Sequence, residues 1–134
     1  MSKDDNRALR EELESCRALQ AEISDYKRRT AELQKEQRCL TSLIAEGTGN
    51  ASDLAALNIL IADRVSHQRR ARERLEKKLL EADKKISRIP NAELRVILRQ
   101  RYIDGLTWEA IGRRNGHPWT AWAKVKVHRF FYKN

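Results

Sequence analysis

Apolar residues recur at alternating steps of three and four along the first third of the chain. The series reads Cys16, Leu19, Ile23, Tyr26, Thr30, Leu33, Gln37, Leu40 and Ile44, with mostly charged residues between these positions and Leu9 extending it toward the N-terminus. Such a narrow stripe is typical of a coiled-coil helix. Thr30 and Gln37 place polar side chains in it, which lowers stability and can fix register or partner number. We predict one helix over about residues 4–45.

A second amphipathic segment follows the interruption at residues 46–52, where two glycines, Asn50 and the candidate cap Ser52 break the pattern. Its seam reads Ile61, Val65, Gln68, Arg72, Leu75, Leu79, Ala82, Ile86 and Ile89, with a shift of phase upstream at Leu54 and Leu57. We predict a helix over about residues 53–89. The short link predicts an antiparallel hairpin. Because a narrow stripe buries little area, we expect the hairpin to self-associate; the alternative is a monomeric hairpin that covers the C-terminal domain.

Three shorter helices are predicted after Pro90, which disfavours helical geometry at the residue before it, and Asn91 is a good N-cap. The first runs to about residue 104 and ends at Gly105; its apolar face is Leu94, Ile97, Leu98 and Tyr102. The second runs from Thr107 to about residue 115, with Ala110 and Ile111 inward and Gly112 allowing another backbone to come close. The third spans about residues 118–132, with Pro118 in its first turn and Trp122, Val125 and Phe131 as its apolar repeat. The prediction is an all-α fold with a hairpin in residues 1–89 and a helix-turn-helix domain in residues 90–134.

The charge of the chain is concentrated in its last third. The 134 residues carry a net charge of +9, and residues 88–134 contribute ten basic and three acidic side chains to it. A compact basic segment attracts polyanions, of which nucleic acid and anionic membranes are the usual ones. The longest nearly apolar run, residues 54–62, is too short to cross a bilayer, and the N-terminus does not resemble a signal peptide. We therefore expect a protein of the cytosol without a membrane partner, in which Cys16 and Cys39 stay reduced.

The segment "RYIDGLTWEAIG", residues 101–112, carries the clearest motif. Together with Leu94, Leu98 and Gly116, its residues Arg101, Tyr102, Asp104, Gly105, Leu106, Thr107, Glu109, Ile111 and Gly112 make residues 86–131 resemble region 4 of sigma-70-type transcription factors. Within that group the chain is similar to the phage-encoded regulators of the RinA and ArpU type. It departs from their pattern at Asn115, His117, Pro118 and Trp122, which lie at the turn and the start of the last helix. The resemblance implies a helix-turn-helix fold but no particular target sequence.

This resemblance implies a phage or prophage regulator of transcription in the cytosol of a bacterial host. Its partners would be double-stranded DNA and, as a second candidate, RNA polymerase, with a homodimer formed through the hairpin. A basic helix fits the major groove, and phosphate neutralisation supplies much of the affinity. By helical phase, the groove candidates are Trp119, Thr120, Ala123 and Lys124. Thr107 is a candidate phosphate contact, and the candidates for clamping the DNA backbone are Arg113, Arg114, Lys126 and Lys133.

Competing interpretations of single residues remain at this level. Trp108 and Trp122 are expected in the core, because a domain of this size needs bulky side chains, whereas Trp119 faces either DNA or the core. His128 is expected to be partly buried. The sequence holds no nucleophile elbow, phosphate loop, catalytic triad or zinc-ligand spacing, so we expect neither an enzyme nor a metal or cofactor site. Two other binding functions compete with transcription regulation: an adaptor that docks on polymerase without DNA, and a small-terminase-like subunit of phage packaging.

Overall fold

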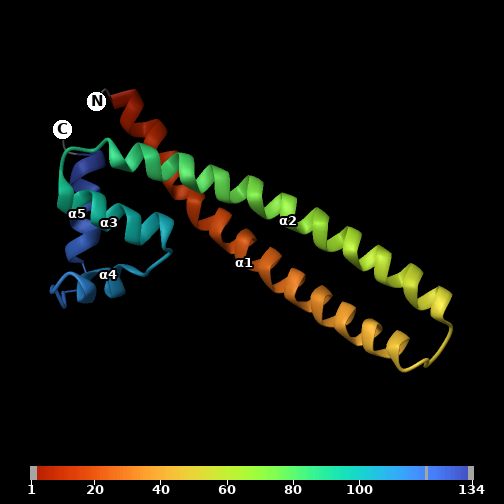
Figure 1. Ribbon diagram of the computed structural model, residues 1–134. Helices are drawn as coiled ribbons and strands as arrows, with labels where there is room; N and C mark the ends of the chain where they lie inside the picture. The colour runs from red at the N-terminus through yellow and green to blue at the C-terminus, as the bar shows by residue number, and fades with distance from the viewer. Residues whose placement is uncertain (1–2, 120, 133–134) are drawn as a thin grey trace. The chain divides into compact units, whose positions relative to one another are not determined.

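The computed structural model describes residues 3–119 and 121–132, and every regular element in these ranges is a helix (Figure 1). The elements are α1 (Lys3–Ala45), α2 (Ala51–Ser87), α3 (Ala92–Leu98), the π-helical segment η1 (Arg99–Ile103), α4 (Trp108–Arg114) and α5 (Trp122–Tyr132). The predicted all-α fold is confirmed, with α1 packed against α2. The contacts divide the chain into a hairpin unit, residues 21–76, and a terminal unit, residues 1–20 and 77–134.

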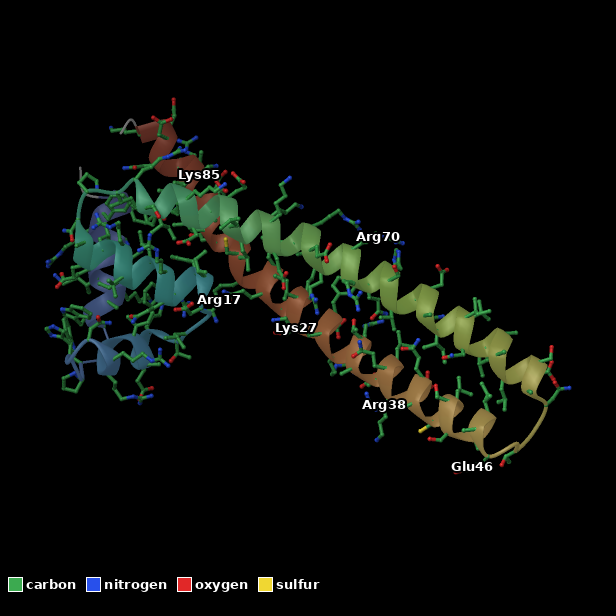
Figure 2. The ribbon with its side chains drawn as sticks, in the orientation of Figure 1. Arg17, Lys27, Arg38, Glu46, Arg70 and Lys85 are labelled. Carbon is green, nitrogen blue, oxygen red and sulfur yellow. The ribbon has the colours of Figure 1, made fainter. Side chains whose placement is uncertain are left out.

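The hairpin unit consists of the distal parts of α1 and α2 and the turn that joins them. The predicted seam lies between the helices, where the buried side chains are Ile23, Thr30, Leu40, Ile61 and Val65. Its polar positions meet, because the Thr30 hydroxyl donates to the Gln68 side-chain oxygen at 3.5 Å. Lys27, Arg38 and Arg70 are exposed on the outer faces of the two helices (Figure 2). The unit therefore has the narrow apolar core that the sequence pattern predicts.

The turn between α1 and α2 is capped by Asn50 rather than by Ser52. The Asn50 Oδ1 atom accepts hydrogen bonds from the backbone N–H groups of Ser52, at 2.9 Å, and Asp53, at 3.2 Å. These are two of the orphan donors at a helix N-terminus, so α2 begins at Ala51, two residues earlier than predicted.

The core of the terminal unit is shared by helices from both ends of the chain. Its buried residues are Leu9, Leu13 and Cys16 from α1; Ala82 and Ile86 from α2; Ile89; Leu94, Ile97 and Leu98 from α3; Tyr102; Ile111 from α4; and Trp122, Ala123 and Val127 from α5. Leu13 is fully buried although the predicted stripe omitted it. The C-terminal helices thus pack on the first turns of α1 and the last turns of α2, which supply apolar surface that a segment of this size lacks.

Polar contacts join α1 and α2 to the C-terminal helices within the terminal unit. The Gln20 amide donates to the backbone carbonyls of Tyr102, at 3.0 Å, and Ile103. Arg99 donates to Asp83 at 2.8 Å and to the Ser87 hydroxyl at 2.6 Å. These bonds fix the orientation of α3 and η1 on the two long helices.

The predicted boundaries around α3 are largely confirmed. The side chain of Asn91 accepts from the Leu94 N–H at 3.1 Å and caps α3, while α2 ends at Ser87, before Pro90. The helix then widens into η1, where the Asp104 N–H bonds to the Arg99 carbonyl at 2.9 Å. Gly105 follows with a φ of 77°, the left-handed conformation expected of a residue that ends a helix. Among the described residues, no helix is both long enough and apolar enough to span a membrane.

Candidate nucleic-acid interface

The turn between α4 and α5 is tight because Gly112 has no side chain. A Cβ atom at this position would lie 2.6 Å from the carbonyl oxygen of His117 and 3.3 Å from that of Trp119. Gly116 turns the chain with a φ of 77°. The close backbone approach predicted at Gly112 is therefore present, and the connection between α4 and α5 packs directly on the α4 backbone.

The last helix begins later than the sequence predicts. We placed its start near residue 118, with Pro118 in the first turn, whereas α5 begins at Trp122. The carbonyls of His117 and Trp119 lie against the α4 backbone at Gly112, which keeps this segment out of the helix. The Trp122 N–H bonds to the Trp119 carbonyl at 3.2 Å, and the regular i to i−4 pattern is present by the Val125 N–H, which bonds to the Ala121 carbonyl at 2.9 Å.

The side chains of α5 that face the core also differ from the predicted ones. Val125 is only half-buried, and the core face consists of Trp122, Ala123 and Val127, with Phe130 and Phe131 packed against it. Ala123 has no exposed surface, so its assignment as a groove contact is wrong. The apolar spacing from Ala123 to Val127, Phe130 and Phe131 is the usual i, i+4, i+7, i+8 repeat and could have identified this face.

Two of the predicted backbone-clamping residues are engaged within the protein. The Lys126 Nζ atom lies 2.8 Å from a Glu93 carboxylate oxygen and 5.5 Å from the centre of the Trp122 ring. Arg113 donates to Glu109, one helical turn earlier, at 2.9 Å. Both side chains of the Arg113–Glu109 pair are largely exposed, so this pair can open at little cost, whereas Lys126 also covers part of the core.

Four described side chains on or near α5 are exposed, and we call Arg114, Trp119, Lys124 and His128 the α5 face. Lys124 is exposed on α5, as is Arg114 at the end of α4. Trp119 is 61% exposed, which decides against its packing in the core. His128 lies one turn after Lys124 and is exposed rather than partly buried. Arg129 is also exposed, but it lies about 140° around α5 from Lys124, on the side of Glu93 and Lys126. Our assignment omitted both residues, although α5 contains no acidic residue and four basic or imidazole side chains.

Thr107 caps the N-terminus of α4. Its side-chain oxygen accepts from the Ala110 N–H at 3.1 Å, and its backbone is extended. Capping uses the oxygen as an acceptor, so the O–H remains a donor that can reach a phosphate. Thr120 and Lys133, the other two predicted contacts, lie outside the described residues.

The remaining tryptophans stabilise the domain, as predicted. The Trp122 ring stacks on the His117 imidazole, with ring centres 3.9 Å apart and planes at 10°. Trp108 meets Tyr102 edge-on, and the Arg101 guanidinium lies 4.2 Å from the centre of its ring. Each ring thus has a defined partner as well as a place against the core.

The departures from the sigma pattern have structural partners in this chain. Asn115, where the pattern has leucine, donates to the Gln100 side chain at 2.8 Å and to the Ile111 carbonyl at 2.7 Å. His117, where an aliphatic residue is usual, covers the Trp122 ring. In this chain, hydrogen bonds of Asn115 and the stacked rings of His117 and Trp122 therefore replace the aliphatic contacts expected from the sigma pattern.

Burial shapes the ionisation of three groups in the terminal unit. It lowers the pKa of Arg101, with the nearby charge of Arg17 acting in the same direction, and it raises the pKa of the Tyr102 hydroxyl. Burial, assisted by the charge of Glu12, raises the pKa of the Cys16 thiol to about 11. Cys16 is therefore an uncharged core residue at neutral pH.

Comparisons with known proteins found no matching family model, no matching curated protein and no matching solved structure. The resemblance to sigma region 4 consequently rests on the residues named above.

Proposed function

We propose that this protein is a DNA-binding regulator of transcription whose α5 face enters the major groove. The observation that supports this most strongly is the exposure of Lys124 and His128 on one face of a helix without acidic residues, directly after the close-packed connection between α4 and α5. An α-helix fits the major groove of B-DNA, and basic side chains gain affinity by releasing counterions from phosphates.

The individual contacts follow from the positions on this surface. Lys124 and Trp119, near the N-terminal end of α5, are placed to reach base edges, because the first turns of a recognition helix usually do so. Arg114 and Thr107, on α4, are placed for phosphates on the flanking strand. The sequence resemblance adds the biological setting, a phage or prophage regulator, and the hairpin provides self-association or a contact with RNA polymerase.

Binding to a pool of random duplex DNA, followed by selection and sequencing of the bound fraction, tests this function. We expect enrichment of a defined site and a Lys124→Ala variant that binds this site at least tenfold more weakly. Lys84→Ala is the matched control, because it removes the same charge from an exposed lysine in the same unit but on α2. Absence of any enriched site, or equal loss from both variants, would reject the proposal. Capture of RNA polymerase without DNA binding would favour the adaptor function instead.

A further inference from the structure

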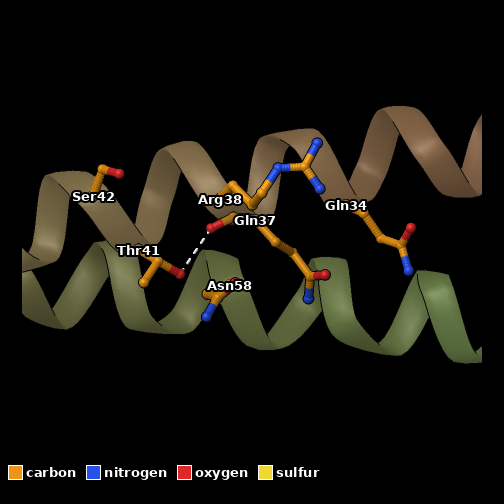
Figure 3. A pocket seen from close by; sticks show the side chains of 6 residues that line it. All are labelled: Gln34, Gln37, Arg38, Thr41, Ser42 and Asn58. Carbon is orange, nitrogen blue, oxygen red and sulfur yellow. Dashed lines mark hydrogen bonds between the residues drawn. The ribbon is translucent and has the colours of Figure 1, made fainter.

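The two flanks of the hairpin unit differ in chemistry. One flank carries a polar groove lined by Gln34, Gln37, Arg38, Thr41, Ser42 and Asn58 (Figure 3). The opposite flank carries a groove of about 750 Å³, in which the apolar residues Leu33, Leu40, Leu57 and Ile61 are combined with Arg29, Glu32, Lys35, Glu36, Cys39, Arg64 and Gln68. We call this second groove and the adjoining Leu60 the apolar flank. Helical phase separates the flanks, because Gln37 and Thr41 lie on the other side of Leu40 from Glu36 and Cys39.

The apolar flank exposes side chains that the hairpin does not bury by itself. Leu57 is 47% exposed and Leu60 is 57% exposed, and Cys39 is exposed beside them. The buried cluster underneath contains only Leu40, Ile61 and Val65 among the described residues, with Leu33 and Leu54 partly buried. Long helices gain most of their stability from packing an apolar face, so further burial on this flank would stabilise the unit.

The charges on the apolar flank suit a second copy of the same chain. In the described part of the chain, Lys35, Glu36 and Arg64 form no ion pair, and they place both signs on one surface. A two-fold contact uses the same patch twice, so a patch that carries both signs can complement itself. A polyanion or a strongly charged protein would match a surface of a single sign instead.

The register of the hairpin makes this complementarity specific. Leu40 clusters with Ile61, and Glu36 and Arg64 line the same groove, so the two charges lie at one level along the helices. A two-fold axis parallel to the helices places α1 of each copy over α2 of the other. Each Glu36 then faces Arg64 of the other copy, while Leu57 and Leu60 cover the region around Cys39.

We propose that a second copy of this chain docks on the apolar flank and buries Leu57, Leu60 and Cys39 in a two-fold four-helix contact. This inference rests on the self-association part of the proposed function and does not require DNA binding. The groove has eleven lining residues, about half of the 20–30 that a standard interface uses on each side, so the contact extends past them to Leu60 and beyond.

Sedimentation equilibrium of the full chain without DNA tests this inference. We expect a mass of twice 15.7 kDa and at least a tenfold rise in the dimer dissociation constant for Leu60→Glu. Ile59→Glu is the matched control, because Ile59 is 70% exposed and points away from α1. Circular dichroism at low concentration checks that both variants keep their helices. A monomeric wild type, or equal effects of the two variants, would overturn the inference.

A charge exchange tests the register. Glu36→Lys should weaken the dimer, and combining it with Arg64→Glu should restore the wild-type dissociation constant. A double variant that dimerises no better than Glu36→Lys would overturn the proposed register. The two proposals fail separately, because a monomer that binds DNA contradicts only the dimer, and a dimer that binds no DNA contradicts only the regulator.

Discussion

The substitution Leu13→Ala tests whether the N-terminal turns of α1 are part of one core with the C-terminal helices. Leu13 has no exposed surface and belongs to the same cluster as Ile97, Ile111 and Trp122. Removing a fully buried leucine side chain costs its transfer free energy and leaves a cavity, in total about 3 kcal/mol. In a unit of this size, each kcal/mol shifts the melting temperature by roughly 4–8 °C, so a decrease of about 12–24 °C is expected.

Tryptophan fluorescence is the assay, because all three tryptophans lie between residues 108 and 122. The signal therefore reports the C-terminal helices, although the substitution is more than 90 residues away in sequence. Leu80→Ala is the control, since Leu80 belongs to the same unit but is 53% exposed, and it should change stability by less than about 1 kcal/mol. If Leu13→Ala left the fluorescence transition unchanged, the shared core would be refuted.

Four further outcomes follow from two glycines and the two cysteines. Gly105→Ala should lower the free energy of unfolding by at least about 1 kcal/mol, measured by urea titration, because the φ of 77° is strained for alanine. An unchanged midpoint would contradict this. Gly112→Ala should also destabilise, despite alanine's better helix propensity, since its Cβ would meet a backbone carbonyl at 2.6 Å; a stabilised variant in the same titration would contradict the tight turn. At pH 8 a maleimide should label Cys39 and spare Cys16 in the folded Leu60→Glu monomer, as mass spectrometry can show, because Cys39 is exposed and Cys16 is buried in the single chain. Burial raises the pKa of the Cys16 thiol from 9.0 to about 11. The stability contributed by the uncharged thiol is therefore complete below pH 9 and is lost as the pH rises toward 11. A Cys16→Ala variant should lose less stability than the wild type between pH 9 and pH 11.

The helices and their main boundaries were predictable because their signals are local. Periodicity located α1 and α2, and the residues Asn91, Gly105 and Thr107 marked helix ends through chemistry that depends only on neighbouring residues. The four predicted core residues from Leu94 to Tyr102 are all buried for the same reason.

The errors came from contacts between segments distant in sequence or between adjacent elements. Ala123 is the exception, because it was misassigned by following the apolar repeat from Trp122 to Val125 and Phe131 instead of the local repeat that starts at Ala123. The engagement of Lys126 by Glu93 joins residues 33 apart, and no local pattern indicates it. Leu13 continues the local spacing from Leu9 to Cys16, so its burial could have been predicted, whereas its place in one core with the C-terminal helices could not.

The salt dependence of duplex DNA binding tests the central proposal most directly. Fluorescence anisotropy between 50 and 200 mM salt should give a linear fall of log K with log salt concentration, at a slope of about −0.9 for each phosphate neutralised. If Lys124 contacts a phosphate, Lys124→Ala should reduce the magnitude of that slope by about one. If Lys124 contacts a base, the variant should keep the slope and lose affinity mainly for the selected site. No binding at low salt, or binding that does not respond to salt, would contradict the proposal that the α5 face recognises DNA.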